Sequence, residues 1–276
     1  MGERSRRFVL ASVVGGCAVT SACSLFTSLE GFSAGEESSP GSTDAWPPDA
    51  DATATDASTL DAGDGGDTSP FCASLKSPLA LCEDFDSEPL FDGWTVREVG
   101  DGSNVATTTS TFRSAPKALR AEIGSLRETR RAYIDRTFPT VTSHARLGYS
   151  VYIDQRPTEG ELEVNILRFN AADEARDFFL SVTPTDVSYV QQQGARTNIP
   201  LSRPIPLKTW VRIDLEVVLT GTKTVTVRVD GIEAAKQAAL YAIPAPTRVT
   251  AGITYTGNTP NAGVVLVDDV TFEIVD

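Results

Sequence analysis

Histidine is almost missing from this 276-residue chain: His144 is the only one. A zinc site built from cysteine and histidine needs several ligands close together, and His144 has no partner of its kind. No serine- or cysteine-centred nucleophile motif accompanies it, which excludes a histidine-based hydrolase triad. The glycine-rich stretch "GDGG" lies in a low-complexity acidic tract, so a phosphate-binding loop is excluded as well.

Apolar runs of about 20 residues, the length needed to cross a bilayer, are also missing. The nearest is Phe8–Val19, which follows a short region with three arginines and precedes the small residues before Cys23. This order of basic, apolar and small residues is typical of a secretory signal. We therefore expect residues 1–22 to direct export.

The segment "VTSAC" at residues 19–23 resembles a bacterial lipobox, in which small residues precede a cysteine that is acylated and becomes the mature N-terminus. The resemblance implies a lipid on Cys23 and anchorage to the bacterial cell envelope. Ser24 after that cysteine resembles the pattern that permits sorting to the outer membrane. The alternative is an ordinary signal peptide, cut after Ala22 or within "FSAG", and both Sec and twin-arginine export stay open.

Cysteines are few, and two of the four, Cys17 and Cys23, belong to the signal and the anchor. Cys72 and Cys82 remain, and the nine residues between them are too many for a Cys-x-x-Cys redox motif. In the oxidising compartment that an exported protein meets, nearby cysteines pair. The sequence therefore predicts a Cys72–Cys82 disulfide.

Basic residues are absent from residues 24–70, which hold ten acidic residues among many small and polar ones. Such a segment buries too little apolar surface to offset its ordering entropy and repels itself. We expect residues 23–70 to be the lipidated cysteine and a disordered acidic linker. Residues 71–276 carry 26 acidic and 21 basic residues without a basic stripe, so nucleic acid is excluded as a partner.

Alternating apolar and polar residues predict β-strands through residues 71–276. The clearest are "TWVRIDLEVVL" and "TVTVRVDG", which form a hairpin, and "ARLGYSVYID", which places Leu147, Tyr149, Val151 and Ile153 on one face. Strand pairs are also predicted around Pro184 and at the chain end, with turn signals every 8–12 residues or so. "NAADEARDF" is open between a short helix and a loop, and "IEAAKQAAL" favours one helical turn. The fold class is an all-β sandwich.

Three segments in this order resemble the concanavalin A-like jelly rolls, which include legume lectins, laminin-G-like modules and laminarin-degrading glucanases. They are "CEDFDSEPLFDGWTV", "TWVRIDLEVVL" with "TVTVRVDGI", and "VVLVDDVTFEI". The resemblance implies a jelly-roll β-sandwich over residues 71–276 in which the terminal strand lies beside the first. The whole chain is similar to uncharacterised bacterial lipoproteins with an acidic tether.

The glucanases of this family carry Glu-x-Asp-x-x-Glu on a central strand, where paired carboxylates act as nucleophile and acid/base. The matching segment here is "GELEVNILRF", in which strand alternation places Glu161, Glu163 and Asn165 on one face. A second Glu stands where the family has Asp, and no acid follows at the third place. We therefore expect no catalytic turnover.

Glycan binding needs exposed aromatic rings that stack on sugars, flanked by amides and charged groups. The sequence offers a set of candidates that we expect to contact a glycan: Glu161, Glu163, Asn165, Arg168, Tyr152, Tyr189, Gln192 and Tyr255.

Two acidic pairs, Asp84 with Asp86 and Asp268 with Asp269, are expected to approach each other because the first and last strands are neighbours. Several family members hold a structural Ca²⁺ at this place through carboxylate and backbone oxygens. Strand alternation allows only one of Asp268 and Asp269 to point inward. The alternative is a set of hydrogen-bonded carboxylates without metal.

These features together predict a cell-envelope lipoprotein that presents a non-catalytic, lectin-like domain to glycans or cell-wall polymers. Two alternatives stay open: a divergent glycan-degrading enzyme, and a structural envelope lipoprotein that binds protein partners.

Overall fold

A computed structural model describes residues 71–75, 79–89, 91–125, 128–170, 175–256 and 262–275. The predicted signal, Cys23 and the linker lie outside these residues. The described part is an antiparallel β-sandwich with a single short helix, α1 (Phe71–Ser74). It contains no helix long and apolar enough to span a membrane.

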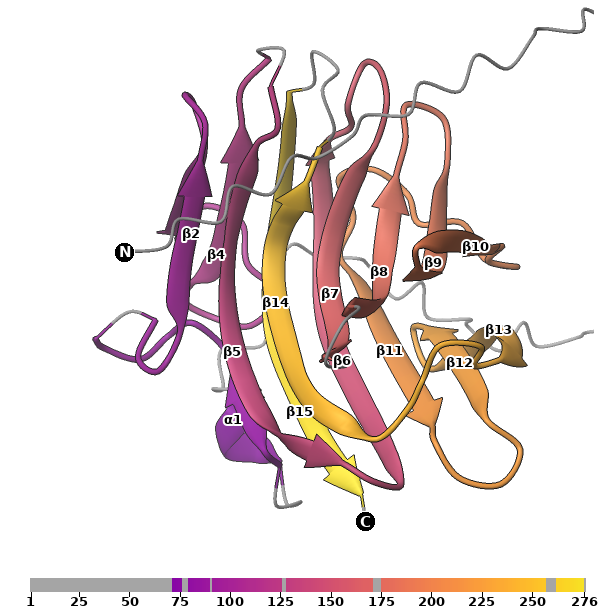
Figure 1. Ribbon diagram of the computed structural model, residues 1–276. Helices are drawn as coiled ribbons and strands as arrows, with labels where there is room; N and C mark the ends of the chain where they lie inside the picture. Colours follow the sequence, from indigo (N-terminus) through magenta and orange to yellow (C-terminus); the bar gives the residue numbers. More distant parts are fainter. Residues whose placement is uncertain are drawn as a thin grey trace, which may run out of the picture. The chain divides into compact units, whose positions relative to one another are not determined.

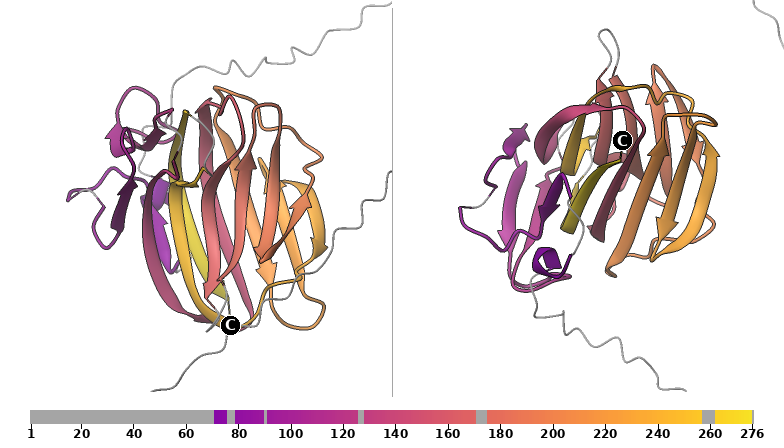
Figure 2. Two further views of the ribbon diagram at one scale, coloured as in Figure 1. Left: turned by 45° about the horizontal axis from the view of Figure 1, so that its top comes forward. Right: turned by 90° about the horizontal axis from the view of Figure 1, so that it is seen from below.

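The sandwich consists of two sheets that face each other (Figures 1 and 2). The eight-stranded sheet has the order β13-β12-β11-β6-β15-β4-β3, with β1 also paired to β15. Its strands are β1 (Leu81–Glu83), β3 (Asn104–Thr108), β4 (Ala118–Ile123), β6 (His144–Gln155), β11 (Val211–Val218), β12 (Thr224–Val229), β13 (Ile232–Ala238) and β15 (Gly263–Val275).

The seven-stranded sheet has the order β10-β9-β8-β7-β14-β5-β2, and β5, β14, β7 and β8 form the near layer in Figure 1. Its strands are β2 (Thr95–Val99), β5 (Arg131–Val141), β7 (Leu162–Asn170), β8 (Ala175–Val182), β9 (Val187–Gln193), β10 (Ala195–Ile199) and β14 (Ala245–Tyr255).

The core lies between the two sheets and follows the predicted alternation. In β11 every second residue is buried, and β12 pairs with it as the predicted hairpin. On β6, Leu147, Tyr149, Val151 and Ile153 are all at most 1% exposed, which confirms that they share the inner face. The jelly-roll β-sandwich that the sequence predicts is therefore the observed fold.

Two segments for which a helical turn was considered contain strand residues. "IEAAKQAAL" contributes β13, because its residues pair with the edge of β12 across a bulge at Val227 and Arg228. The one-turn helix was wrong, since a free strand edge offers more hydrogen bonds than a short isolated turn. In "NAADEARDF", β8 begins at Ala175, and residues 171–174 lie outside the described residues.

The start of the domain is fastened to its end, as predicted. Cys72 on α1 and Cys82 on β1 form a disulfide. β1 pairs with the terminal strand β15, with Cys82 opposite Thr271. The Cys72 N–H donates to Asp84 Oδ2 at 3.2 Å, so the helix is also held by a hydrogen bond.

Removing the disulfide should lower the stability of the sandwich, because a bridge that closes a loop of this size contributes roughly 2.5–3 kcal/mol. The double variant Cys72→Ser, Cys82→Ser should melt roughly 5–12 °C below the parent protein, measured by calorimetry under oxidising conditions. Adding a reductant should lower the melting temperature of the parent and leave that of the variant unchanged. Equal melting temperatures for parent and variant would contradict the stabilising role.

Candidate functional site

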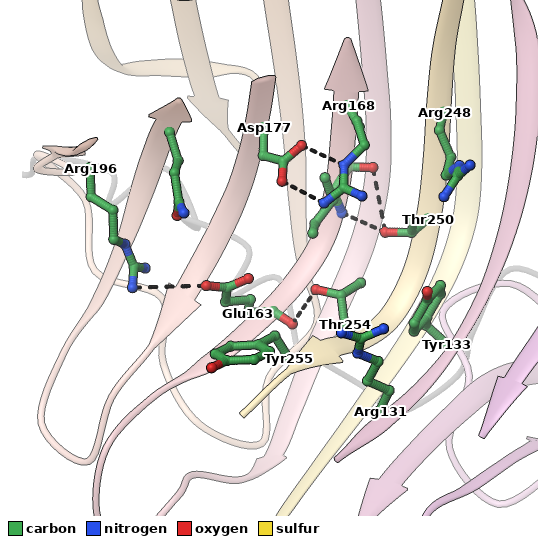
Figure 3. Close-up of a pocket in the computed structure, with 12 residues that line it drawn as sticks. Arg131, Tyr133, Glu163, Arg168, Asp177, Arg196, Arg248, Thr250, Thr254 and Tyr255 are labelled. Carbon is green, nitrogen blue, oxygen red and sulfur yellow. Dashed lines mark hydrogen bonds and ion pairs between the residues drawn. The ribbon is translucent and has the colours of Figure 1, made fainter. Parts of the chain in front are cut away.

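A groove of about 330 Å³ lies on the outer face of the seven-stranded sheet. Its walls come from β5, β7, β8, β9, β14 and the residue Arg196 on β10. Most of the side chains that line it are polar (Figure 3). They are four arginines (Arg131, Arg168, Arg196, Arg248), two acids (Glu163, Asp177), two tyrosines (Tyr133, Tyr255), two threonines (Thr250, Thr254), Gln192 and Ile166.

The outward direction of these side chains on β7 depends on a bulge. Asn165 has a φ of 49°, and the pairing with β8 jumps from Val164 opposite Leu180 to Leu167 opposite Phe178. One extra residue in a strand reverses the alternation beyond it. Glu163 before the bulge and Arg168 after it therefore lie on the same outer face.

Asn165 itself is 1% exposed and lies between β7 and β14. Its Oδ1 accepts a hydrogen bond from the Gly252 N–H at 2.8 Å, and Thr250 Oγ1 accepts one from the Ile166 N–H at 2.7 Å. These side chains satisfy backbone donors that the bulge takes out of the ladder. The prediction that Asn165 faces a ligand was wrong, because the bulge directs its side chain toward Gly252 on β14, where it is buried.

Gly252 is required at this point of β14. Its φ is +110°, and a Cβ built there would meet the Ala132 carbonyl oxygen at 2.5 Å. A side chain cannot be accommodated against the neighbouring backbone, so glycine allows the two strands to approach.

An apolar floor lies beneath part of the groove. Ile166, Phe179 and Val190 are each at most 4% exposed and form a cluster separate from the main core. The guanidinium of Arg196 lies over the Phe179 ring, with 5.1 Å from Cζ to the ring centroid. This stacking holds Arg196 above the floor and keeps its nitrogens toward the groove.

Two of the arginines are paired with acids. Arg168 makes two hydrogen bonds of 2.6 Å to the carboxylate of Asp177. Arg196 binds both oxygens of Glu161, and its Nη1 lies 3.8 Å from Glu163 Oε1. These acids largely neutralise the β8 to β10 side of the groove.

The other two arginines are much less engaged. Arg131 forms no ion pair with any part of the chain that the structure describes. Arg248 approaches Asp135 only at 4.0 Å, while Asp135 accepts a 3.0 Å hydrogen bond from Arg97. The β5 and β14 side of the groove therefore keeps its positive charge.

Glu163 is the acid with an altered proton affinity in the groove. Burial raises the pKa of Glu163 to about 7, with Glu161 and Asp177 adding to the rise and Arg196 opposing it. Its side chain is only 14% exposed. Near neutral pH it is therefore divided between the acid and the carboxylate.

The structure brings together four of the predicted ligand-binding residues: Glu163, Arg168, Gln192 and Tyr255. Glu161 lies at the edge, where it holds Arg196. The other two candidate tyrosines, Tyr152 and Tyr189, do not line this groove.

Tyr189 is fully buried on the inner face of β9, where its ring belongs to the core and its hydroxyl approaches Tyr149. Tyr152 lies on the outer face of the opposite sheet, with its ring centroid 5.4 Å from that of Trp210. Strand alternation predicts which residues of one strand share a face. It does not predict which of the two sheets the strand joins.

The sequence reasoning missed several groove residues: Arg131, Tyr133, Asp177, Arg196, Arg248, Thr250 and Thr254. In "RAYID", Arg131, Tyr133 and Asp135 alternate with the buried residues Ala132 and Ile134. The sequence was therefore sufficient to predict that these three side chains point outward from β5. The missing information was that β5 is a neighbour of β14.

The acidic residues at the first and last strands of the sandwich lie close together. Burial is the main cause that raises the pKa of Asp86 to about 6, and the charges of Asp84 and Asp269 add to the rise. The Lys117 N–H, which donates a hydrogen bond to Asp86, lowers this pKa. Burial and Asp269 raise the pKa of Asp268 to about 8. Because β1 pairs with β15, with Glu83 opposite Val270, Asp84 and Asp86 lie near Asp269, as the sequence predicted.

Asp268 and Asp269 are both buried and share Ser114 as a donor, so they lie on the same side of β15, and the expected alternation to opposite faces does not hold here. Asp269 has a φ of 52°, and the pairing with β6 shifts between Asp268 and Thr271, so a bulge breaks the alternation. Both side chains reach Ser114: its N–H donates to Asp268 at 3.0 Å and its hydroxyl to Asp269 at 2.7 Å.

These carboxylates are supplied with donors from the protein. Asp268 also accepts from the Arg113 and Asp269 N–H groups at 2.8 Å, and Asp269 accepts from the Ser150 hydroxyl at 3.1 Å. Among the described residues, no group of three or more His, Cys, Asp or Glu side chains is arranged to hold a metal ion. A calcium ion bound by these carboxylates therefore stays a prediction.

The fold is similar to those of several solved structures. An endo-beta-1,4-glucuronan lyase from the fungus Trichoderma reesei has a TM-score of 0.58 at 11% identity, covering 72% of this chain and 96% of that one. The cellulose induced protein Cip1 has a TM-score of 0.54 at 12% identity, covering 71% and 97%. A sialidase has a TM-score of 0.50 at 13% identity, covering 71% of this chain and 18% of that one.

No protein-family model matches the sequence, and no curated protein matches it. At such low identities the likeness to the solved structures shows the fold alone.

Proposed function

We propose that this chain is a cell-envelope lipoprotein whose sandwich binds glycans in the outer groove of the seven-stranded sheet, without turnover. The observation that carries the proposal is a polar groove with two tyrosines at its wall and an unsatisfied amide oxygen. Tyr255 is 38% exposed, and within the described part of the chain the buried Oε1 of Gln192 has no hydrogen-bond partner. Sugar hydroxyls supply donors for such an oxygen, and sugar faces stack on tyrosine rings.

The similar structures support a glycan as the ligand class. One of them acts on glucuronan, and this chain covers nearly the whole of that protein. Fold does not determine function, so the proposal depends on the groove residues and not on the likeness.

Glycosidic turnover is the second candidate, and Glu163 is the observation that favours it. A carboxyl group with a pKa of about 7 is suited to proton transfer near neutral pH. Against it, Asp177 and Glu161 are held by arginines, so among the described residues at the groove no second carboxylate is free to complete a pair.

Replacing Tyr255 by Ala should weaken glycan binding roughly 5- to 10-fold, because the ring that stacks on the sugar is lost. The full mature chain is tested by calorimetry or pull-down against a panel of neutral and charged polysaccharides. Tyr152→Ala is the matched control, since this tyrosine lies on the opposite sheet, and its affinity should equal that of the parent protein.

Recovery of shortened polysaccharide from the same assay would replace the binding function by turnover. Absence of binding across the panel, or equal loss in both tyrosine variants, would contradict a glycan site in the groove.

The anchor is the second part of the proposal. A cysteine carrying several acyl chains attaches effectively permanently, at about 0.8 kcal/mol per buried methylene. The linker would then hold the sandwich away from the membrane, with the groove open to a polymer in the envelope.

Cys23→Ser should release the protein from the membrane fraction into the soluble fraction of the cells that export it, because the acylated thiol is gone. Cys17→Ser is the control and should leave the protein with the membranes, since this residue is removed with the signal. Membrane association of the Cys23 variant, with no acyl adduct on the parent protein by mass spectrometry, would contradict the anchor.

A further inference from the structure

The groove is divided by charge into two halves. On the β8 to β10 side, the arginines are held by acids of the same protein: Asp177 binds Arg168 with two hydrogen bonds, and Glu161 binds Arg196. On the β5 and β14 side, Arg131 and Arg248 lack such partners among the described residues, apart from the 4.0 Å approach of Arg248 to Asp135.

The two arginines of the second half can donate hydrogen bonds to a ligand. The Nε of Arg248 is buried, lies 4.0 Å from Asp135 Oδ2, and has no hydrogen-bond partner among the described residues. A guanidinium offers five donors in a planar fork that matches the two oxygens of a carboxylate. A buried donor of this kind is satisfied when an acceptor group on a ligand reaches it.

Arg131 and Arg248 lie at opposite ends of this half, with Tyr133 between them (Figure 3). Arg131 is next to Ala132, which pairs with Ile253, whereas Arg248 pairs with Thr137. Six strand positions therefore separate them, or about 20 Å of backbone at ~3.3 Å per residue. This spacing suits a ligand that carries anionic groups at more than one position along its length.

We propose that the glycan bound in the groove is a polyanionic polysaccharide with repeated carboxylates, a polyuronate, and that Arg131 and Arg248 recognise those carboxylates. This inference rests on the proposed glycan-binding function and specifies its ligand class. Tyr133 and Tyr255 contact the sugar rings between the charges. The paired arginines Arg168 and Arg196 shape the neutral side of the groove.

The experiment measures binding of the full mature chain to polygalacturonate, polyglucuronate and polymannuronate at low salt. Methyl-esterified polygalacturonate has the same backbone without the charge, and dextran sulfate has charge without carboxylates. We expect at least one polyuronate to bind at least roughly tenfold more tightly than the methyl ester and dextran sulfate, and raising the salt from 50 to 500 mM should weaken that binding.

The double variant Arg131→Gln, Arg248→Gln should bind the polyuronate and its methyl ester equally. Arg146→Gln is the matched control, because this arginine lies on the opposite sheet in ion pairs with Glu216 and Glu273, and it should keep the preference for charge. Circular dichroism of each variant verifies that the sandwich is folded.

Three outcomes would overturn the inference: equal binding of the polyuronate and its ester by the parent protein, tighter binding of dextran sulfate than of every polyuronate, or an undiminished preference in the double arginine variant. Binding of neutral polysaccharides alone would overturn the ligand class and leave the glycan-binding function in place. Failure of every polysaccharide, charged or neutral, would overturn both.

Discussion

The hydrogen bond from the Gly252 N–H to Asn165 Oδ1 is the interaction on which the groove depends. It lies where β7 carries one residue too many for β8 and where β14 needs a glycine to approach its neighbours. Asparagine tolerates a positive φ better than most residues, and its amide replaces the acceptor that the ladder lacks. With strict alternation, Leu167 and Phe169 would face solvent and Arg168 would enter the core. With the bulge, both apolar residues are fully buried and Arg168 reaches the groove.

A second bulge, at Asp269, organises the opposite sheet in a similar way. It brings two adjacent carboxylates to Ser114, near the place where the disulfide-linked β1 joins β15. Buried carboxylates are costly unless donors surround them, and here backbone N–H groups and hydroxyls supply those donors. The first and last segments of the sandwich are therefore held together by a disulfide on β1, the pairing of β1 with β15 and a hydrogen-bonded acidic cluster. The groove lies on the other sheet, built on strands from the middle of the chain and on β14.

The sequence was sufficient for the strands and for their general arrangement. Alternation identified β6, β11 and β12, and the order of three motifs placed the terminal strand beside the first. It failed where a residue's direction depends on a bulge or on a distant strand. In "VSYVQQQ", Val190 faces outward onto the small apolar floor, while Gln191 is fully buried because its amide bonds the backbone at Ala238 and Leu240. From polarity alone, Val190 would be predicted as buried and Gln191 as exposed. The loop at Ala238 and Leu240, which covers Gln191, explains the observed arrangement. Three of the four groove arginines, Arg131, Arg196 and Arg248, were missed because they come from strands that only the sheet order brings together.

The central claim, that the Asn165–Gly252 contact aligns the groove, is tested most directly by hydrogen exchange at the Gly252 amide in the parent protein and in Asn165→Ala. Exposed Asn198 on β10 provides the control, Asn198→Ala. The account predicts a slowly exchanging Gly252 amide in the parent protein and the control, and exchange faster by roughly one to two orders of magnitude in Asn165→Ala, since the loss of a buried hydrogen bond costs about 1–3 kcal/mol. Amides of β6 and β11 in the opposite sheet should keep their protection. Unchanged protection of Gly252 in Asn165→Ala would contradict the claim.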